Sequence, residues 1–281
     1  MSTTSLRPSL AEIVEHGYRL LIAAKLRGVR AFSGDRPIPL GVWLGMHALL
    51  RRIAPYSDPL TPPQRGRPYT GAHLRTPVLR DLLRDDLLGT WALDVESIDF
   101  LWQRLMRDRP AVVVEFGAGV SSILLATYAA TRRTHDGSPA LVISFEQDAR
   151  EQERVEGRLR RVGLGDALHI LPLTVDAAGY SSCDETELSR LLAGSRIDWA
   201  LLDGPAGPDG CRIWTLPLIA AHCRPGTRWF LDDALRSGEL QVLRQWQNWP
   251  GLHVAGIYPL GKGLGEGIVK DALQLAKAKR R

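Results

Sequence analysis

The chain of 281 residues is 44% hydrophobic and 24% charged, and its 36 basic and 31 acidic side chains give a formal net charge of +5. These proportions exclude a disordered or fibrous chain and allow a sizeable buried core. Three cysteines without a CxxC pair indicate neither a disulfide framework nor a zinc knuckle, so we expect a reducing, cytoplasmic location. No apolar stretch reaches the roughly 18–20 residues that a membrane span needs.

The excess positive charge lies entirely in the amino-terminal part. Residues 1–110 carry 16 basic and 11 acidic side chains, whereas residues 111–281 carry 20 of each. The basic residues are dispersed among acids such as Asp81, Asp85 and Asp86, without forming a basic stripe. We therefore expect no nucleic-acid partner.

The amino-terminal segment is expected to be helical and then irregular. Apolar residues between Leu10 and Ala24 recur near the helical period, and Ser9 is placed to cap such a helix. Six prolines between Pro55 and Pro77 then disfavour both helix and strand. We predict that residues 1–93 form a helical extension with a proline-rich connector.

From residue 94 onward, the pattern is typical of a parallel sheet covered by helices. A helix over 94–107 is predicted, with Asp94 as its cap. Short, continuously apolar runs, which indicate strands buried on both faces, then alternate with helical stretches. The predicted strands are 111–116, 141–146, 168–173, 199–203 and 228–232, and the predicted helices begin near Val120, Ala149, Glu185, Cys211 and Leu235.

The end of the chain departs from this alternation. Residues 252–260 and 264–270 are two strand-like runs joined by Gly261, Lys262 and Gly263, which predicts a β-hairpin. We therefore expect an α/β fold with a Rossmann-like, seven-stranded, mostly parallel sheet that ends in an antiparallel hairpin. This domain would span residues 94–270, followed by a basic tail over 271–281.

A glycine turn follows the first predicted strand of this domain. The run Glu115-Phe116-Gly117-Ala118-Gly119 leads into a helix, where free backbone N–H groups can bind a ligand. Glu146 ends the next strand, 29 residues after Gly117, where a carboxylate can accept both hydroxyls of a ribose. The two features favour a nucleoside-containing ligand over a purely structural turn, or over a Glu146 that only complements a helix dipole.

Two observations bear on which nucleoside ligand fits. A dinucleotide loop usually has a third glycine or alanine, and Ser122 occupies that place. Glu115 would also repel a pyrophosphate, whereas it can accept a hydrogen bond from an ammonium group, directly or through water. A sulfonium ligand with an amino-acid tail therefore fits better than NAD(P).

These motifs resemble those of class I S-adenosylmethionine-dependent methyltransferases, over about Val112 to Lys270. Within that class the chain is similar to a bacterial group with Asp-Gly-Pro after the fourth strand and Asp-Asp after the fifth. The usual third glycine of the family's first motif is Ser121 here. The resemblance implies S-adenosyl-L-methionine as cofactor, bound by Glu115, Gly117, Gly119, Ser121, Glu146 and Asp203. The matching segments are Asp203-Gly204-Pro205-Ala206-Gly207, Leu231-Asp232-Asp233 and Gly261-Lys262-Gly263-Leu264.

Carboxylates at the ends of predicted strands are the candidate catalytic residues. Asp203 would orient an acceptor hydroxyl or act as general base, unless it only caps the turn that follows it. Metal-dependent O-methyltransferases similar to this class hold Mg²⁺ with an acid after the fourth strand and a pair such as Asp232 and Asp233 after the fifth. The metal is a possibility that the sequence does not favour, because Pro205 and Gly207 can give the loop another shape. His169, inside a predicted strand, is expected to be a core residue.

The expected function is transfer of a methyl group to an oxygen or nitrogen of a small molecule or glycan. The Asp203-Gly204-Pro205-Ala206 segment stands where methyltransferases of nucleic-acid bases have Asn/Asp-Pro-Pro-aromatic, which argues against a nucleic-acid acceptor. The alternatives are an NAD(P)-dependent oxidoreductase and a catalytically silent nucleoside-binding protein. The sequence leaves the acceptor, the metal and the oligomeric state open.

Overall fold

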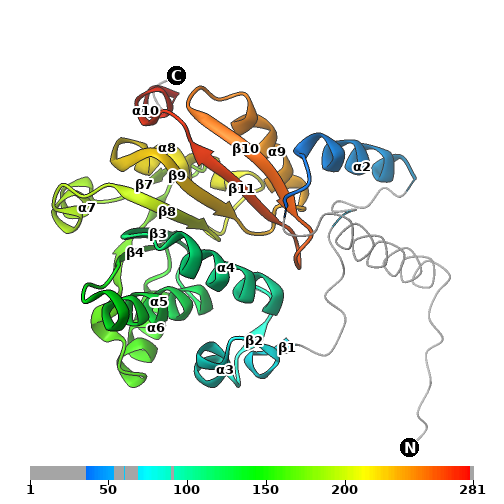
Figure 1. The fold of residues 1–281 in the computed structure, drawn as a ribbon. Helices are drawn as coiled ribbons and strands as arrows, with labels where there is room; N and C mark the ends of the chain where they lie inside the picture. The colour runs from blue at the N-terminus through cyan, green and yellow to red at the C-terminus, as the bar shows by residue number, and fades with distance from the viewer. Residues whose placement is uncertain (1–35, 54–59, 61–68, 90–91, 279–281) are drawn as a thin grey trace, which may run out of the picture.

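The structure is a computed structural model that describes residues 36–53, 60, 69–89 and 92–278 (Figure 1). The helix predicted between Leu10 and Ala24, with its cap Ser9, lies outside the described residues. None of the described helices is both long and apolar enough to cross a membrane.

A seven-stranded sheet forms the centre of the molecule. Its strand order is β10-β11-β9-β8-β3-β4-β5, and β11 runs antiparallel to both of its neighbours while the other neighbouring pairs are parallel. The predicted sheet with a terminal antiparallel hairpin is therefore confirmed. The strands are β3 (Val112–Phe116), β4 (Leu141–Glu146), β5 (His169–Pro172), β8 (Ile197–Leu202), β9 (Cys223–Leu231), β10 (Leu252–Tyr258) and β11 (Leu264–Val269).

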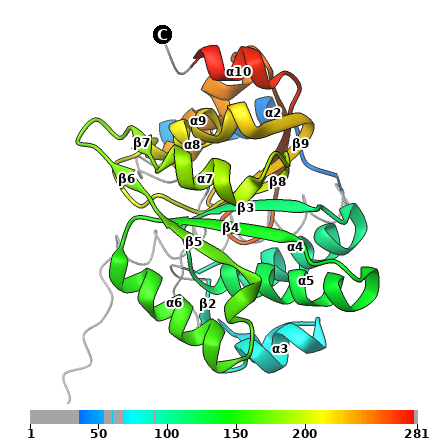
Figure 2. The ribbon, with the colours of Figure 1, turned by 90° about the vertical axis from the view of Figure 1, so that its left-hand side faces the viewer.

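Helices cover both faces of the sheet (Figure 2). Val112, Val114 and Phe116 of β3 belong to one hydrophobic core, and Val113 belongs to the other, so successive side chains of this strand pack on opposite faces. This two-sided burial explains why the strand is continuously apolar. One face carries α3 (Pro77–Leu83), α4 (Val95–Asp108), α5 (Val120–Asp136) and α6 (Ala149–Arg161); the other carries α2 (Leu40–Ile53), α7 (Glu185–Leu192), α8 (Thr215–Ile219), α9 (Ser237–Gln247) and α10 (Ala272–Ala278).

Most predicted helix starts are confirmed, but the helix expected at Cys211 is wrong. Asp94 caps α4, since its Oδ1 accepts hydrogen bonds from the amides of Glu96 and Ser97 at 2.8 and 2.9 Å. At Cys211 the chain instead forms a 3-10 turn, η3 (Cys211–Trp214), followed by the five-residue α8. Pro217 lies within α8 and has no N–H to continue a helical ladder from the preceding turn.

Several short elements were not predicted. They connect the main helices and strands and carry too few residues for a periodic pattern. These are β1 (Tyr69–Thr70), η1 (Gly71–His73), β2 (Leu87–Leu88), η2 (Gly165–Ala167), β6 (Thr174–Val175), β7 (Ser181–Ser182) and η4 (Ala220–His222).

Both ends of the described chain pack on the sheet. Ile38 forms an antiparallel bridge with Ile257 of β10, and the buried Trp43 indole donates a hydrogen bond to the carbonyl of Ile257 at 3.3 Å. At the other end, α10 lies within the segment predicted as a tail, and its Leu275 is fully buried in the core.

We expect Leu275→Ala to lower the free energy of unfolding by about 2–5 kcal/mol, because it leaves a cavity in the core. Leu273→Ala is the matched control on the same helix: Leu273 is 75% exposed, so the change should stay within about 0.5 kcal/mol. Urea unfolding followed by circular dichroism measures both. Equal effects in the two variants would contradict the packing of α10.

Candidate functional site

The site lies where the strand order reverses. After β3 the chain adds β4 and β5 on one side of it, and β8 then pairs with the opposite side of β3. Open α/β sheets bind their ligands beyond the carboxyl ends of the strands at such a reversal, so the loops after β3 and β8 are the candidate site. Gly117 follows β3 and Asp203 follows β8.

The loops after β3 and β8 contact each other backbone to backbone. Gly117 has a φ of +91°, and a Cβ built on it would lie 2.9 Å from the Gly204 nitrogen. A Cβ on Gly204 would in turn lie 2.8 Å from both the nitrogen and the Cα of Gly117. Gly119 differs, because nothing lies within 4 Å of the position of its Cβ. The absence of side chains at Gly117 and Gly204 thus allows the two loops to pack closely, whereas Gly119 borders open space.

Glu115 is fully buried within β3 and is held by serines. Its Oε2 accepts hydrogen bonds from the hydroxyls of Ser122 at 2.6 Å and Ser144 at 2.8 Å, and the Ser122 oxygen accepts one from the amide of Gly119 at 3.0 Å. Ser122 thus connects the glycine turn to Glu115, which gives a reason for a serine at the place where a dinucleotide loop usually has glycine or alanine. Among the described residues, Glu115 Oε1 has no hydrogen-bond partner.

Burial dominates the ionisation of Glu115. It raises the pKa of this carboxyl to about 7, although the hydroxyls of Ser121, Ser122 and Ser144 act in the opposite direction. Ser121, predicted to contact the cofactor, is itself only 2% exposed. The structure therefore places Ser121 close to Glu115 and away from solvent.

Glu146 fastens the end of β4 to the glycine turn. Its Oε2 accepts a hydrogen bond from the amide of Ala118 at 2.7 Å, and its Oε1 accepts one from the amide of Asp148 at 2.8 Å. The residue is 8% exposed. An ionised carboxylate has about four acceptor positions, so each oxygen retains one for a ligand hydroxyl.

The three candidate catalytic aspartates come together. Asp203 follows β8, and Asp232 and Asp233 follow β9; one oxygen of each lies within 4.8 Å of the others. Their side chains differ in exposure, with 13% for Asp203 against 1% for Asp232 and 4% for Asp233. Of the three, Asp203 is the most accessible to a ligand.

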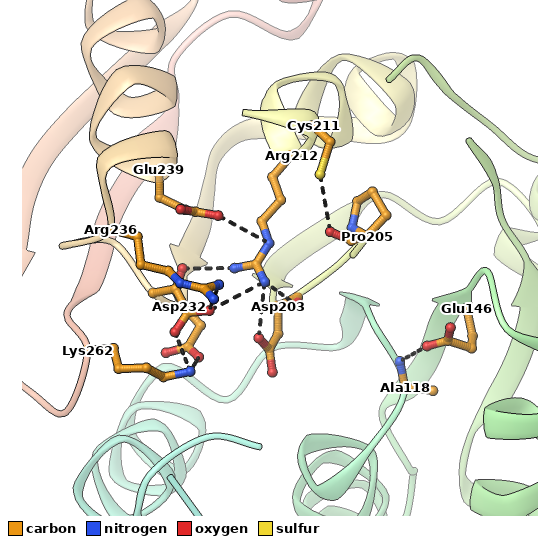
Figure 3. A network of polar contacts seen from close by, with 11 residues as sticks. Ala118, Glu146, Asp203, Pro205, Cys211, Arg212, Asp232, Arg236, Glu239 and Lys262 are labelled. Atoms are coloured by element: carbon orange, nitrogen blue, oxygen red, sulfur yellow. Dashed lines mark hydrogen bonds and ion pairs between the residues drawn. The ribbon is translucent and has the colours of Figure 1, made fainter. Parts of the chain in front are cut away.

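Three cations surround these aspartates, of which Arg212 and Lys262 are buried and Arg236 is partly exposed (Figure 3). None of the three was predicted as a site residue. Arg212 Nη2 lies 3.6 Å from Asp203 Oδ1 and 3.6 Å from Asp233 Oδ2, and it also donates to the carbonyl of Asp203 at 2.8 Å. Lys262 Nζ contacts Asp233 Oδ1 and lies 4.0 Å from Asp232 Oδ2. Arg236 Nη1 lies 2.7 Å from Asp233 Oδ2.

The pKa shifts follow from burial and from these pairs. Burial raises the pKa of Asp203 to about 6, against the opposing effect of Arg212. Burial and the neighbouring carboxylates of Asp203 and Asp233 raise the pKa of Asp232 well above its usual range. Burial lowers the pKa of Lys262, but Asp232 and Asp233 raise it by more, so Lys262 is protonated.

A sequence signal for Lys262 did exist. Because β10 is parallel to β9, the turn between β10 and β11 lies at the same edge of the sheet as Asp232 and Asp233. Lys262 is in that turn and would have been placed near the aspartates by this reasoning. Arg212 has no comparable signal, since its position depends on the shape of the loop after β8.

The aspartates do not fit a divalent metal ion in this arrangement. Carboxylate oxygens are suitable ligands in kind. However, the Lys262 ammonium group already contacts Asp233 and lies 4.0 Å from Asp232 Oδ2. A metal ion about 4 Å from it would be repelled by roughly 4 kcal/mol per unit of ion charge at an effective dielectric constant of about 20. The positive charge that a metal would supply is already present.

A separate cavity of about 260 Å³ lies beside the edge strand β5. Glu156, Arg160, His169 and Glu187 are among its lining residues, and none of the predicted site residues lines it. The expectation that His169 is a core residue is wrong: it is exposed, because β5 is the outermost strand of the sheet.

Comparisons with known proteins give structural neighbours only. No protein-family model matches the chain, and no curated protein matches it. Similar solved structures include a methyltransferase from Geobacter sulfurreducens, with 19% identity over 63% of this chain and 80% of that one and a TM-score of 0.44. A second is the O-methyltransferase TomG from Streptomyces achromogenes in complex with SAM, with 14% identity over 65% of this chain and 83% of that one and a TM-score of 0.47. A third is an O-methyltransferase from Bacillus cereus in complex with SAH, with 15% identity over 65% of this chain and 84% of that one and a TM-score of 0.46. These identities are too low to assign an activity to this chain.

We expect Gly204→Ala to destabilise the protein by about 1–3 kcal/mol, because the added methyl group overlaps the backbone of Gly117. Gly119→Ala, in the same pair of loops, should change the free energy of unfolding by less than about 1 kcal/mol, since its Cβ meets no atom. Thermal unfolding of the two variants checks this difference, and a neutral Gly204→Ala would contradict the contact between the loops.

Proposed function

We propose that the protein is a methyltransferase that binds S-adenosyl-L-methionine and methylates an oxygen or nitrogen of a small molecule or glycan in the cytoplasm. One observation carries the proposal: the Glu146 carboxylate is bonded to the glycine turn at the point where the strand order reverses. This is the arrangement in which a carboxylate and a glycine turn hold a nucleoside ligand.

The residues present fit this cofactor. Glu146 would accept hydrogen bonds from the ribose hydroxyls. The open space beside Gly119 allows a ligand to approach the start of α5, where the helix dipole and backbone amides add polar contacts. Glu115 Oε1, a buried acceptor without a partner among the described residues, is suited to the ammonium group of the methionine part, directly or through water.

The cofactor would supply an activated methyl group on a sulfonium sulfur. The protein then has to align the acceptor with that methyl group. Where the acceptor is a hydroxyl, the protein also has to accept the proton that this hydroxyl loses. Asp203 is suited to the second task, because it is the most exposed of the three aspartates and a pKa of about 6 leaves it ionised at neutral pH. Asp232 and Asp233 would hold the surrounding loop in place.

Binding and activity measurements would distinguish two alternative functions from a methyltransferase. An NAD(P)-dependent oxidoreductase would quench NADH fluorescence on binding and would not respond to S-adenosylhomocysteine. A catalytically silent binding protein would bind S-adenosylmethionine in calorimetry and methylate nothing in a broad screen of extracts. The buried carboxyl of Glu115 below the glycine turn disfavours the pyrophosphate of NAD(P) whenever it is ionised.

We expect calorimetry to detect S-adenosylmethionine binding to the wild-type protein, and mass spectrometry to find the cofactor or its demethylated product in the purified protein. Gly119→Arg should abolish binding by filling the open space, and Glu146→Ala should weaken it at least tenfold by removing the ribose acceptor. Gly45→Arg is the matched control, because Gly45 is an exposed glycine on α2 that also has nothing within 4 Å. No binding at millimolar cofactor would refute the proposal.

The pH dependence of binding separates the two nucleoside ligands. A ligand ammonium favours ionised Glu115, whose pKa is about 7 in the free protein, so S-adenosylmethionine affinity should fall up to tenfold per pH unit below that value. A pyrophosphate would show the opposite dependence, since it favours the protonated carboxyl. Calorimetry from about pH 5.5 to about pH 8 measures this. Glu115→Gln should remove the dependence, and an unchanged profile in that variant would assign it to another group such as Asp203.

A further inference from the structure

Lys262 is a buried lysine in a chain that otherwise uses arginine. Lysine accounts for 5 of the 36 basic residues. The Lys262 side chain is only 8% exposed, and its ammonium group contacts Asp233 and lies 4.0 Å from Asp232 Oδ2. A buried lysine is costly unless its charge is paired, so its presence among these aspartates needs an explanation.

The turn that carries Lys262 is fixed on both sides. The carbonyl of Lys262 accepts a hydrogen bond from the amide of Leu235 at 3.0 Å, and the carbonyl of Gly263 accepts one from Ala234 at 2.9 Å. On its other side, a Cβ on Gly261 would overlap the Asp94 carboxylate, so the turn also packs closely against the start of α4. The backbone thus holds Lys262 beside the loop that contains Asp232 and Asp233.

Cations offset most of the negative charge around the aspartates. Asp203, Asp232, Asp233 and Glu239 face Arg212, Arg236 and Lys262, which leaves a formal charge of −1, or −2 when Asp94, whose charge also acts on Asp232, is included. Three carboxylates converging within 4.8 Å would otherwise attract a divalent cation. Lys262 is the cation paired with both Asp232 and Asp233, two of the three carboxylates that would hold such an ion.

We propose that Lys262 replaces a divalent metal ion in this protein: its ammonium group takes the cation position of an otherwise metal-binding aspartate cluster, so that the site works without Mg²⁺. Lys262 is then a positioning residue that keeps Asp232 and Asp233 in place beside Asp203. This inference deepens the proposed function, but its test measures ion binding and does not depend on methyl transfer.

The test is Mn²⁺ binding followed by electron paramagnetic resonance, with Mn²⁺ as the probe. We expect the wild-type protein to bind no stoichiometric Mn²⁺ at about 1 mM, and Lys262→Met, which keeps a similar length and loses the charge, to bind one ion at least about tenfold more tightly. Added Mg²⁺ should also raise the thermal midpoint of Lys262→Met and leave that of the wild type unchanged. Lys270→Met is the matched control, since Lys270 is an exposed lysine at the end of the same hairpin.

Each result bears on the proposal. Binding of one Mn²⁺ by the wild type that is lost in Asp232→Asn would overturn it, as would an Lys262→Met variant that gains no ion. If Lys262→Met does not fold without Mg²⁺, refolding when Mg²⁺ is added supports the proposal. If it does not refold with Mg²⁺ either, the double variant Lys262→Met/Glu239→Gln is tested in its place. The proposal then requires that this double variant bind one Mn²⁺. Calorimetry with S-adenosylmethionine on the wild type tests the proposed function separately, so either idea can fail alone.

Discussion

Carboxylates buried at the ends of parallel strands have to be neutralised or hydrogen-bonded within the protein, and the geometry of the site depends on how this is done. Glu146 accepts hydrogen bonds from two backbone amides, and Glu115 Oε2 accepts them from two serine hydroxyls. The aspartates after β8 and β9 are instead paired with arginine and lysine side chains. The first two acids thereby connect the glycine turn with β4, and the aspartates connect the loops after β8 and β9 with the turn between β10 and β11.

These connections bring order to a region that would otherwise be a set of independent loops. Ser122 links Glu115 to the glycine turn, Glu146 links the same turn to the end of β4, and Gly204 packs against it from the loop after β8. Removing one partner would leave a buried charge or acceptor unsatisfied, which costs more than the lost contact itself. The polar groups of these loops are therefore held in fixed positions.

Local sequence patterns were sufficient for the sheet but not for the charge pairs. The strand over 141–146 has the predicted bounds, because a continuous apolar run and a terminal Glu146 are visible within a few residues. Arg212 contacts Asp203 from η3, in the segment between β8 and β9, and Lys262 reaches Asp233 from a hairpin turn about 30 residues away. Such contacts depend on tertiary structure. The helix expected at Cys211 failed for a related reason, since packing of a short segment with Pro217 replaced the regular helix.

The Ile38 bridge has a consequence for the solubility of the folded sheet. A sheet of seven strands has two edges with unpaired backbone groups, and exposed edges invite pairing between molecules. At β10, residue Ile38 exchanges hydrogen bonds in both directions with Ile257, and α2 packs beside this strand, so part of that edge is closed by the chain itself. At the opposite edge β5 has only four residues and ends in Pro172, which has no N–H to offer. The two edges are thus protected against strand addition by different means, one by covering and one by shortening.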